Sequence, residues 1–158
     1  GLALGARCPV LALDSLALVA EDARVREGAA AESVWVAMDA RMDEVYAGAY
    51  RWVDGAWRCE QGPALWTLPA LAAAWQVAPP ACIAGSALAA FGDRLPRGAA
   101  LCVGAAADRA AALAGLARQA WARGEAIDAA RALPLYLRDK VALTTAERLA
   151  AKAAAAAA

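Results

Sequence analysis

The amino-acid sequence predicts a mixed α/β domain, in which a mixed sheet starts with a three-stranded antiparallel meander and is flanked by helices. Three successive segments have the pattern of strands, at residues 34–38, 44–53 and 56–60. The pair Asp54-Gly55 separates the last two and is typical of a tight hairpin turn, because such turns need positive φ angles. Further along, helical patterns alternate with short β segments, which is typical of helices packed on a sheet. These patterns leave the order of the strands open.

The region before the meander is expected to hold one full helix. Residues 1–6 have the character of a helix end, and residues 9–13 are apolar enough for a short buried strand. Asp14 or Ser15 is then expected to cap a helix that ends near Gly28, because a short polar side chain favours a helix start and glycine a helix end.

Two strands of the meander have distinct patterns. Residues 34–38 are apolar throughout and are expected to be buried on both faces of the sheet. The alternation over residues 44–53 places three aromatic residues on one face: Tyr46, Tyr50 and Trp52. Such a row could stack nucleic-acid bases, but aromatics at this spacing more often form the packing face of a sheet, and we expect packing here.

After the meander, a helix and two short strands are expected. Thr67 can cap a helix that stops at the pair Pro79-Pro80, since proline cannot continue a helix. Short apolar segments at residues 81–84 and 101–103 follow, and each is expected to form a strand.

The last predicted helix covers residues 108–123 and is stopped by Gly124. Its apolar stripe is expected to consist of Leu113, Leu116, Ala117, Ala120 and Trp121. Residues 133–137 form a candidate extended segment. The Ala-rich tail, residues 153–158, has a high helix propensity and nothing apolar to pack against, so we expect it to fray or to extend a terminal helix.

The composition restricts the chemistry that this chain can perform unaided. The sequence contains no histidine, which excludes a self-contained Ser-His-Asp triad, a Cys-His dyad and an H-E-x-x-H zinc site. It also lacks the glycine-rich phosphate loops of nucleotide-binding proteins. The formal net charge is zero, so direct binding to a nucleic-acid backbone is not indicated.

The cysteines and the hydropathy pattern indicate a cytoplasmic protein that does not enter a membrane. Four widely spaced cysteines lie in apolar stretches, and we expect them to be buried free thiols: Cys8, Cys59, Cys82 and Cys102. The longest uncharged segment is interrupted by prolines and cannot cross a bilayer as one helix.

The acidic residues after the first meander strand are the first candidate site. Asp39, Asp43 and Glu44 surround a strand–turn–strand corner and could form a metal or general-base site. The simpler interpretation, which we favour, makes Asp43 and Glu44 solvated turn residues and pairs Asp39 with Arg41.

Two weaker candidates follow short strands. Gly85 and Ser86 could contact a phosphate through backbone amides, although an ordinary strand-to-helix turn explains them more simply. Asp108 precedes the last predicted helix and is a candidate metal ligand, but a helix-capping role is the simpler one.

Two segments resemble one protein family. Residues 37–46, A-M-D-A-R-M-D-E-V-Y, resemble the (I/M)-D-A-R-x-x-E-V-Y signature of bacterial TsaB (YeaZ-type) proteins. Residues 134–138, P-L-Y-L-R, resemble the P-x-Y-L-R segment near the C-terminus of that family, and residues 1–5 and 9–16 agree with it in order. The signature positions are Asp39, Ala40, Arg41, Glu44, Val45, Tyr46, Pro134, Tyr136, Leu137 and Arg138.

The resemblance implies an actin-like, ribonuclease H-like fold and a two-domain protein. Residues 1–152 would then be the C-terminal domain, with the N-terminal domain absent from this sequence. Because the family's main partner-binding surface lies in the N-terminal domain, we expect this chain alone to pair poorly. Asp108 lies roughly where catalytic relatives carry a metal-ligating aspartate.

The resemblance also implies a function. TsaB-type proteins are scaffolds and activating partners of TsaD, which transfers a threonylcarbamoyl group to the adenosine beside the tRNA anticodon. The ATPase TsaE joins the complex, and a homodimer is compatible with the family. We therefore expect no catalytic residue and no cofactor in this chain, and only indirect contact with tRNA. The family carries an older glycoprotease label.

Two alternatives remain open. The older label allows a glycoprotease-like metallopeptidase, which would require a bound metal ion. The fold family allows a sugar-kinase-like ATPase, which would require ATP binding. Fold similarity alone does not decide among these chemistries.

Overall fold

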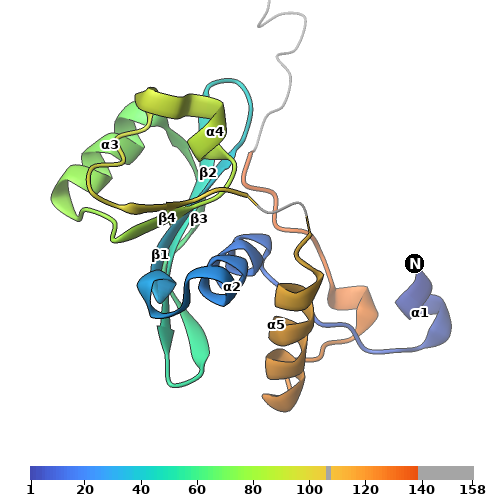
Figure 1. The fold of residues 1–158 in the computed structure, drawn as a ribbon. Coiled ribbons are helices and arrows are strands. Elements are labelled where there is room, and N and C mark those ends of the chain that lie inside the picture. Colours follow the sequence, from blue (N-terminus) through green and yellow to red (C-terminus); the bar gives the residue numbers. More distant parts are fainter. Residues whose placement is uncertain (106–107, 139–158) are drawn as a thin grey trace, which may run out of the picture.

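A five-stranded mixed sheet forms the centre of the molecule (Figure 1). The computed structural model describes residues 1–105 and 108–138. The strands lie in the order β3-β2-β1-β4-β5. Their bounds are β1 Ser33–Asp39, β2 Glu44–Val53, β3 Ala56–Thr67, β4 Cys82–Ala84 and β5 Leu101–Val103. Strands β1 to β3 are antiparallel, whereas β4 and β5 run parallel to β1. The predicted mixed sheet with a leading meander is confirmed.

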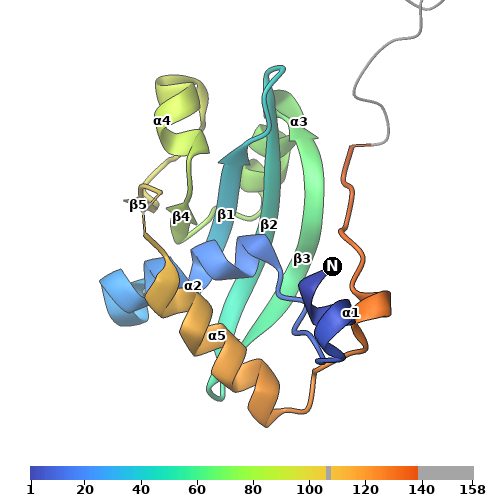
Figure 2. The same ribbon diagram turned by 90° about the vertical axis from the view of Figure 1, so that its right-hand side faces the viewer.

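Helices cover both faces of this sheet (Figure 2). The α-helices are α1 Leu2–Ala6, α2 Ser15–Glu27, α3 Leu68–Val77, α4 Ala87–Phe91 and α5 Ala110–Ala122. Three short 3-10 helices are η1 Gly28–Ala31, η2 Gly92–Arg94 and η3 Ala129–Arg131. One core cluster lies between α2 and the sheet, the other between the sheet and the pair α3 and α4. Helix α5 packs against α2.

Helix α2 begins and ends where its sequence signals predict. The Asp14 side chain accepts a hydrogen bond from the backbone N–H of Leu16 at 2.8 Å, which satisfies one of the free donors at the helix start. Gly28 follows the last residue with a φ of 63°, an angle that favours glycine.

The β2–β3 hairpin also has its predicted turn, but β3 is longer than expected. Asp54 and Gly55 have φ angles of 53° and 79°, as a type I′ turn requires. The prediction ended β3 at residue 60, before Gly62 and Pro63, which are unfavourable in a regular strand. In the structure Gln61 pairs with Ala49 and Ala64 pairs with Ala47, so that two residues of β3 lie opposite one residue of β2. A bulge on an edge strand tolerates proline, since no ladder bond is needed there.

The expected strand at residues 9–13 is not present. Val10 forms a single antiparallel bridge with Ile127, in which each backbone N–H donates to the other residue's carbonyl at 2.9 Å. This bridge joins the two ends of the described chain, and α1 lies beside η3 (Figure 2).

The apolar stripe of α5 was only partly predicted. Leu116 and Ala120 are buried as expected, together with Ala112, but Leu113 and Trp121 are exposed. The helix packs on α2 through small residues, which allow a close approach. The predicted stripe included Leu113 and Trp121, whereas the buried face of the helix consists of Ala112, Leu116 and Ala120.

Of the predictions for the C-terminal part of the chain, the one for residues 133–137 falls on described residues. Residues 133–137 form neither helix nor strand. The tail at residues 153–158, and the domain boundary predicted at residue 152, lie outside the described residues. Within the described part of the chain, none of the helices combines the length and apolar character that crossing a lipid bilayer requires.

The cysteines are free, as predicted, but only Cys82 is buried. Cys59 and Cys102 lie on the edge strands β3 and β5, and Cys8 lies in the loop after α1. An apolar sequence neighbourhood does not bury a side chain at the edge of a sheet, because that side lacks a covering layer.

Candidate functional site

The turn between β1 and β2 has an unusual backbone. Arg41, Met42 and Asp43 have φ angles of 64°, 55° and 64°, so three successive non-glycine residues adopt the left-handed conformation. This conformation costs about 1–2 kcal/mol for each such residue. Two backbone hydrogen bonds close the turn, from Ala40 N–H to the Glu44 carbonyl at 2.9 Å and from Glu44 N–H to the Arg41 carbonyl at 3.1 Å. A strained backbone of this kind persists only where contacts with the surrounding structure hold it in place.

Arg138 contacts this turn from the C-terminal end of the described chain. Its guanidinium donates a hydrogen bond to the Ala40 carbonyl at 3.1 Å and forms an ion pair with the Glu44 carboxylate. A second nitrogen lies 3.7 Å from the Met42 sulfur. Only 14% of the Arg138 side chain is exposed, so these contacts are largely removed from water. The two signature segments of the sequence therefore meet in space.

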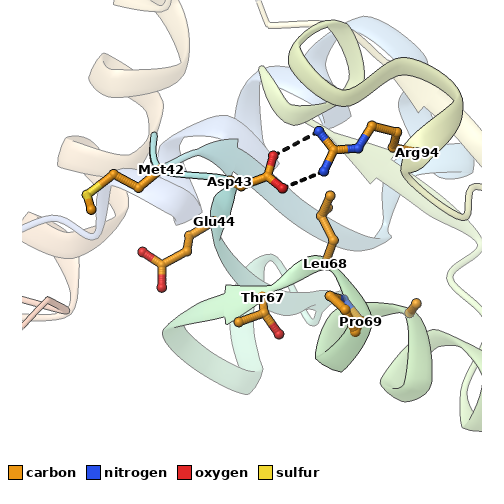
Figure 3. A pocket seen from close by; sticks show the side chains of 8 residues that line it. Met42, Asp43, Glu44, Thr67, Leu68, Pro69 and Arg94 are labelled. Atoms are coloured by element: carbon orange, nitrogen blue, oxygen red, sulfur yellow. Dashed lines mark hydrogen bonds and ion pairs between the residues drawn. The ribbon is translucent and has the colours of Figure 1, made fainter. Parts of the chain in front are cut away.

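Arg94 contacts the same turn from the other side. Its two terminal nitrogens lie 2.8 and 2.5 Å from the two carboxylate oxygens of Asp43 (Figure 3). The hydrogen bonds from Arg94 lower the pKa of the Asp43 carboxyl from its ordinary value. Both side chains are more than half exposed, so the pair is weaker than its geometry alone suggests.

The acidic cluster was thus only partly predicted. Asp39 pairs with Arg41 at 3.3 Å, which confirms the expected pair. Asp43 and Glu44, expected to be solvated, are each bound by an arginine that is distant in sequence. Arg138 was flagged as a signature residue, whereas nothing in the sequence singled out Arg94.

An open depression of about 800 Å³ lies beside the turn (Figure 3). Its apolar lining comes from Met42, Leu68, Pro69 and Ala72. Its polar lining comes from Asp43, Glu44, Thr67 and Arg94. The Thr67 hydroxyl is engaged in capping α3, where it accepts a hydrogen bond from Ala70 N–H at 3.3 Å. With both carboxylates bound by arginines, the depression is a mainly apolar surface of low net charge.

Gly85 and Ser86 lie at the corner between β4 and α4, and their polar groups bond to neighbouring protein groups. Gly85 has a φ of 125°, and a Cβ atom there would lie 2.3 Å from the Ala37 carbonyl oxygen. Its N–H donates to the Val103 carbonyl at 3.0 Å. The Ser86 hydroxyl accepts a hydrogen bond from Asp39 N–H at 3.1 Å. These contacts bind the corner to β1 and β5. They fit the simpler interpretation, in which Gly85 and Ser86 form an ordinary strand-to-helix turn.

Asp108 lies at the start of α5, where its carboxylate accepts a hydrogen bond from Ala110 N–H at 2.8 Å. This contact fits the predicted capping role. Among residues 1–105 and 108–138, no three His, Cys, Asp or Glu side chains are grouped as a metal ion would require.

The aromatic row of β2 contributes to packing. Tyr50 is 2% exposed, and its hydroxyl donates a hydrogen bond to the free oxygen of the Asp14 carboxylate. Trp52 lies under the Arg24 guanidinium, with 4.0 Å between the guanidinium carbon and the ring centre.

The remaining signature residues have mixed environments. Ala40 and Val45 are buried, and Tyr46 is partly buried. Pro134 and Tyr136 are exposed, and Leu137 is partly exposed. Of the second signature segment, Arg138 is therefore the residue with well-defined contacts to the turn.

Comparison with known proteins identifies the relatives of this fold. No family model and no curated protein matches the chain. Two solved structures from Pseudomonas aeruginosa do match: YeaZ, and an uncharacterized protein described as similar to the peptidase YeaZ. Each is 38% identical to this chain over 87% of its length, with a TM-score of 0.74.

The match covers 63% of the length of each Pseudomonas aeruginosa protein, so the chain spans less than two thirds of these relatives. The mixed five-stranded sheet with its flanking helices therefore has a YeaZ-like, actin-type fold. Over the matched region this chain is similar to YeaZ both in sequence and in fold.

Proposed function

We propose that this chain serves as a non-catalytic scaffold and activating partner of a TsaD-type threonylcarbamoyltransferase, which modifies the adenosine beside the tRNA anticodon. In this role it acts in the cytoplasm with a TsaE-type ATPase and contacts tRNA only through the complex. A homodimer is compatible with the role. The proposal applies to the complete protein that contains this sequence.

The observation that carries the proposal is the meeting of the two signature segments. Arg138 is 98 residues from Ala40 and 94 residues from Glu44 in the sequence, yet its contacts with them bring the two signature segments into one site. A resemblance by chance would give no reason for these segments to converge. Their convergence supports the TsaB-type assignment beyond the overall similarity to YeaZ.

The electrostatics of the site support a non-catalytic role. Each of the three carboxylates around the turn is bound by an arginine: Asp39 by Arg41, Asp43 by Arg94 and Glu44 by Arg138. For Asp43, the hydrogen bonds from Arg94 lower the pKa of the carboxyl, which makes it a poor proton acceptor near neutral pH. The arrangement of these ion pairs therefore suits a structural role.

Reconstituted threonylcarbamoyl transfer tests the proposal. A TsaD-type enzyme with TsaE, tRNA and the threonylcarbamoyl-adenylate donor is expected to form modified tRNA much faster when the complete protein that contains this sequence is added. Asp39→Ala and Asp108→Ala variants are expected to stimulate it as well as the unchanged protein. Loss of stimulation in Asp108→Ala, with folding and pairing intact, would contradict a non-catalytic role.

A peptidase activity is the second candidate, because one similar Pseudomonas aeruginosa protein is described as similar to a peptidase. Such an activity would require a metal ion or nucleophile within the complete protein. Elemental analysis of the purified protein, combined with a peptidase assay on unfolded substrates, separates the two candidates. A stoichiometric metal ion together with chelator-sensitive cleavage would favour the peptidase. Binding of ATP by the isolated protein in calorimetry would instead favour the ATPase alternative.

A further inference from the structure

We propose that Arg138 is a latch, which ties the C-terminal segment to the strained turn at residues 40–44 and thereby sets the shape of the neighbouring depression. The latch does not depend on the proposed role in tRNA modification.

The C-terminal segment at residues 132–138 is attached to the turn through this arginine. The segment forms neither helix nor strand, and its large side chains Leu133, Leu135 and Tyr136 are 81%, 73% and 80% exposed. By contrast, the Arg138 side chain is 14% exposed and contacts three residues of the turn. Because the best-buried contacts of this segment are made by Arg138, withdrawal of that side chain is expected to release the segment from the turn.

The backbone conformation of the turn is expected to change when Arg138 no longer contacts it. Three successive left-handed residues, Arg41 to Asp43, are disfavoured by steric contacts of their side chains with the backbone. Arg138 opposes this strain by bonding at both ends of the turn, to the Ala40 carbonyl and to the Glu44 carboxylate. Without it, Glu44 has no other ion pair within residues 1–105 and 108–138 and lies next to the like charge of Asp43, so the backbone can relax toward ordinary φ angles.

The shape of the depression depends on the conformation of the turn, because the two share residues. Met42, Asp43 and Glu44 belong to the turn and also line the depression. Asp43 remains bound by Arg94. Release of Arg138 would therefore first move Met42 and Glu44, which line the same depression. Because coupling is reciprocal, anything that binds the released segment would also alter the depression.

Hydrogen exchange measured by mass spectrometry on the whole chain tests the latch. The Ala40 and Glu44 amides close the turn, so their exchange reports its opening. In Arg138→Ala we expect the peptide over residues 38–46 to exchange at least about tenfold faster, since a charge-assisted contact of this kind is lost. Arg51→Ala, which removes the exposed ion pair with Glu60 at the other end of the sheet, is the matched control and should leave this peptide unchanged.

A second pair of variants separates the latch from a general loss of stability. Glu44→Gln removes the ion pair from the turn side and should also accelerate exchange, so it decides the matter if Arg138→Ala does not fold. Adding Met42→Asn to Arg138→Ala should restore part of the protection, because asparagine tolerates the left-handed conformation. Unchanged exchange over residues 38–46 in a folded Arg138→Ala or Glu44→Gln variant would overturn the proposal.

Discussion

The Trp57 indole N–H donates a hydrogen bond of 2.9 Å to the Glu21 carboxylate and so fastens the edge strand β3 to helix α2. The same carboxylate receives two hydrogen bonds from Arg24, each 2.9 Å long. Glu21 is only 3% exposed, and a buried charge of this kind is stable only when it is fully bonded. The network therefore links a helix to the hairpin that follows it.

Glu21→Ala is expected to lower the free energy of unfolding by about 3 kcal/mol, because Arg24 and the Trp57 N–H both lose their partner. Urea denaturation monitored by circular dichroism measures the change. The matched control is Glu60→Ala, since Glu60 pairs with Arg51 on the exposed face of the same hairpin. It should cost less than about 1 kcal/mol. Equal losses in the two variants would show that burial does not strengthen the Glu21 network.

Gly85→Ala is expected to destabilise the protein by at least about 3 kcal/mol, because strain at a positive φ adds to a direct clash. The new Cβ atom would lie 2.3 Å from the Ala37 carbonyl oxygen of β1. Thermal and urea unfolding give the magnitude. Gly62→Ala is the control, as no atom lies within 4 Å of its Cβ position, and it should change stability by no more than about 1 kcal/mol. A Gly85→Ala variant as stable as Gly62→Ala would refute the described contact of the β4–α4 corner with β1.

The thiols should react with Ellman's reagent in two classes. Cys8, Cys59 and Cys102 are exposed and should be modified in the folded protein, whereas Cys82 is buried and should react only after unfolding. Burial also raises the pKa of the Cys59 thiol, so Cys59 should react more slowly than Cys8 at pH 8. Mass spectrometry of digested, labelled protein assigns the sites. Modification of Cys82 at the same rate as Cys8 would contradict its place in the core.

Stability should decline in alkaline solution through Cys82. Burial raises the pKa of this thiol from its ordinary 9.0 to about 11. The folded state therefore favours the protonated thiol, and its contribution is complete below pH 9 and is lost as the pH rises toward 11. Two pKa units correspond to a loss of up to about 3 kcal/mol. Urea unfolding between pH 8 and pH 11 measures it.

Cys82→Ala supplies the control for this pH dependence. Its stability should fall less steeply over the same interval, because the buried thiol is absent. Some decline should remain, since burial and the hydrogen bond to Asp14 also raise the pKa of Tyr50. An identical slope in the two proteins would show that Cys82 ionises normally in the folded state.

Elements set by local signals were predicted well. The Asp14 cap, the Gly28 stop and the Asp54-Gly55 turn occur where the sequence places them. Each depends on contacts or backbone angles within a few residues. The existence of β1, β2, β4 and β5 also followed from apolar patterns of a few residues.

Elements that depend on distant neighbours were predicted poorly. The length of β3 follows from its pairing with β2 and from the bulge at Gly62 and Pro63. The buried side of α5 follows from the small residues that meet α2, and the exposure of Cys59 follows from its place on an edge strand. In each case the decisive partner lies elsewhere in the chain.

The candidate site likewise combines features set by local sequence with contacts between distant residues. The sequence by itself determined the signature residues around Asp39, the hairpin and the caps, because these depend on side chains a few positions apart. Only the tertiary structure decided that Arg94 would bind Asp43 and that Arg138 would bind Glu44. Ion pairs across 51 and 94 residues form only after the strand order has brought the segments together, and no local pattern encodes that order.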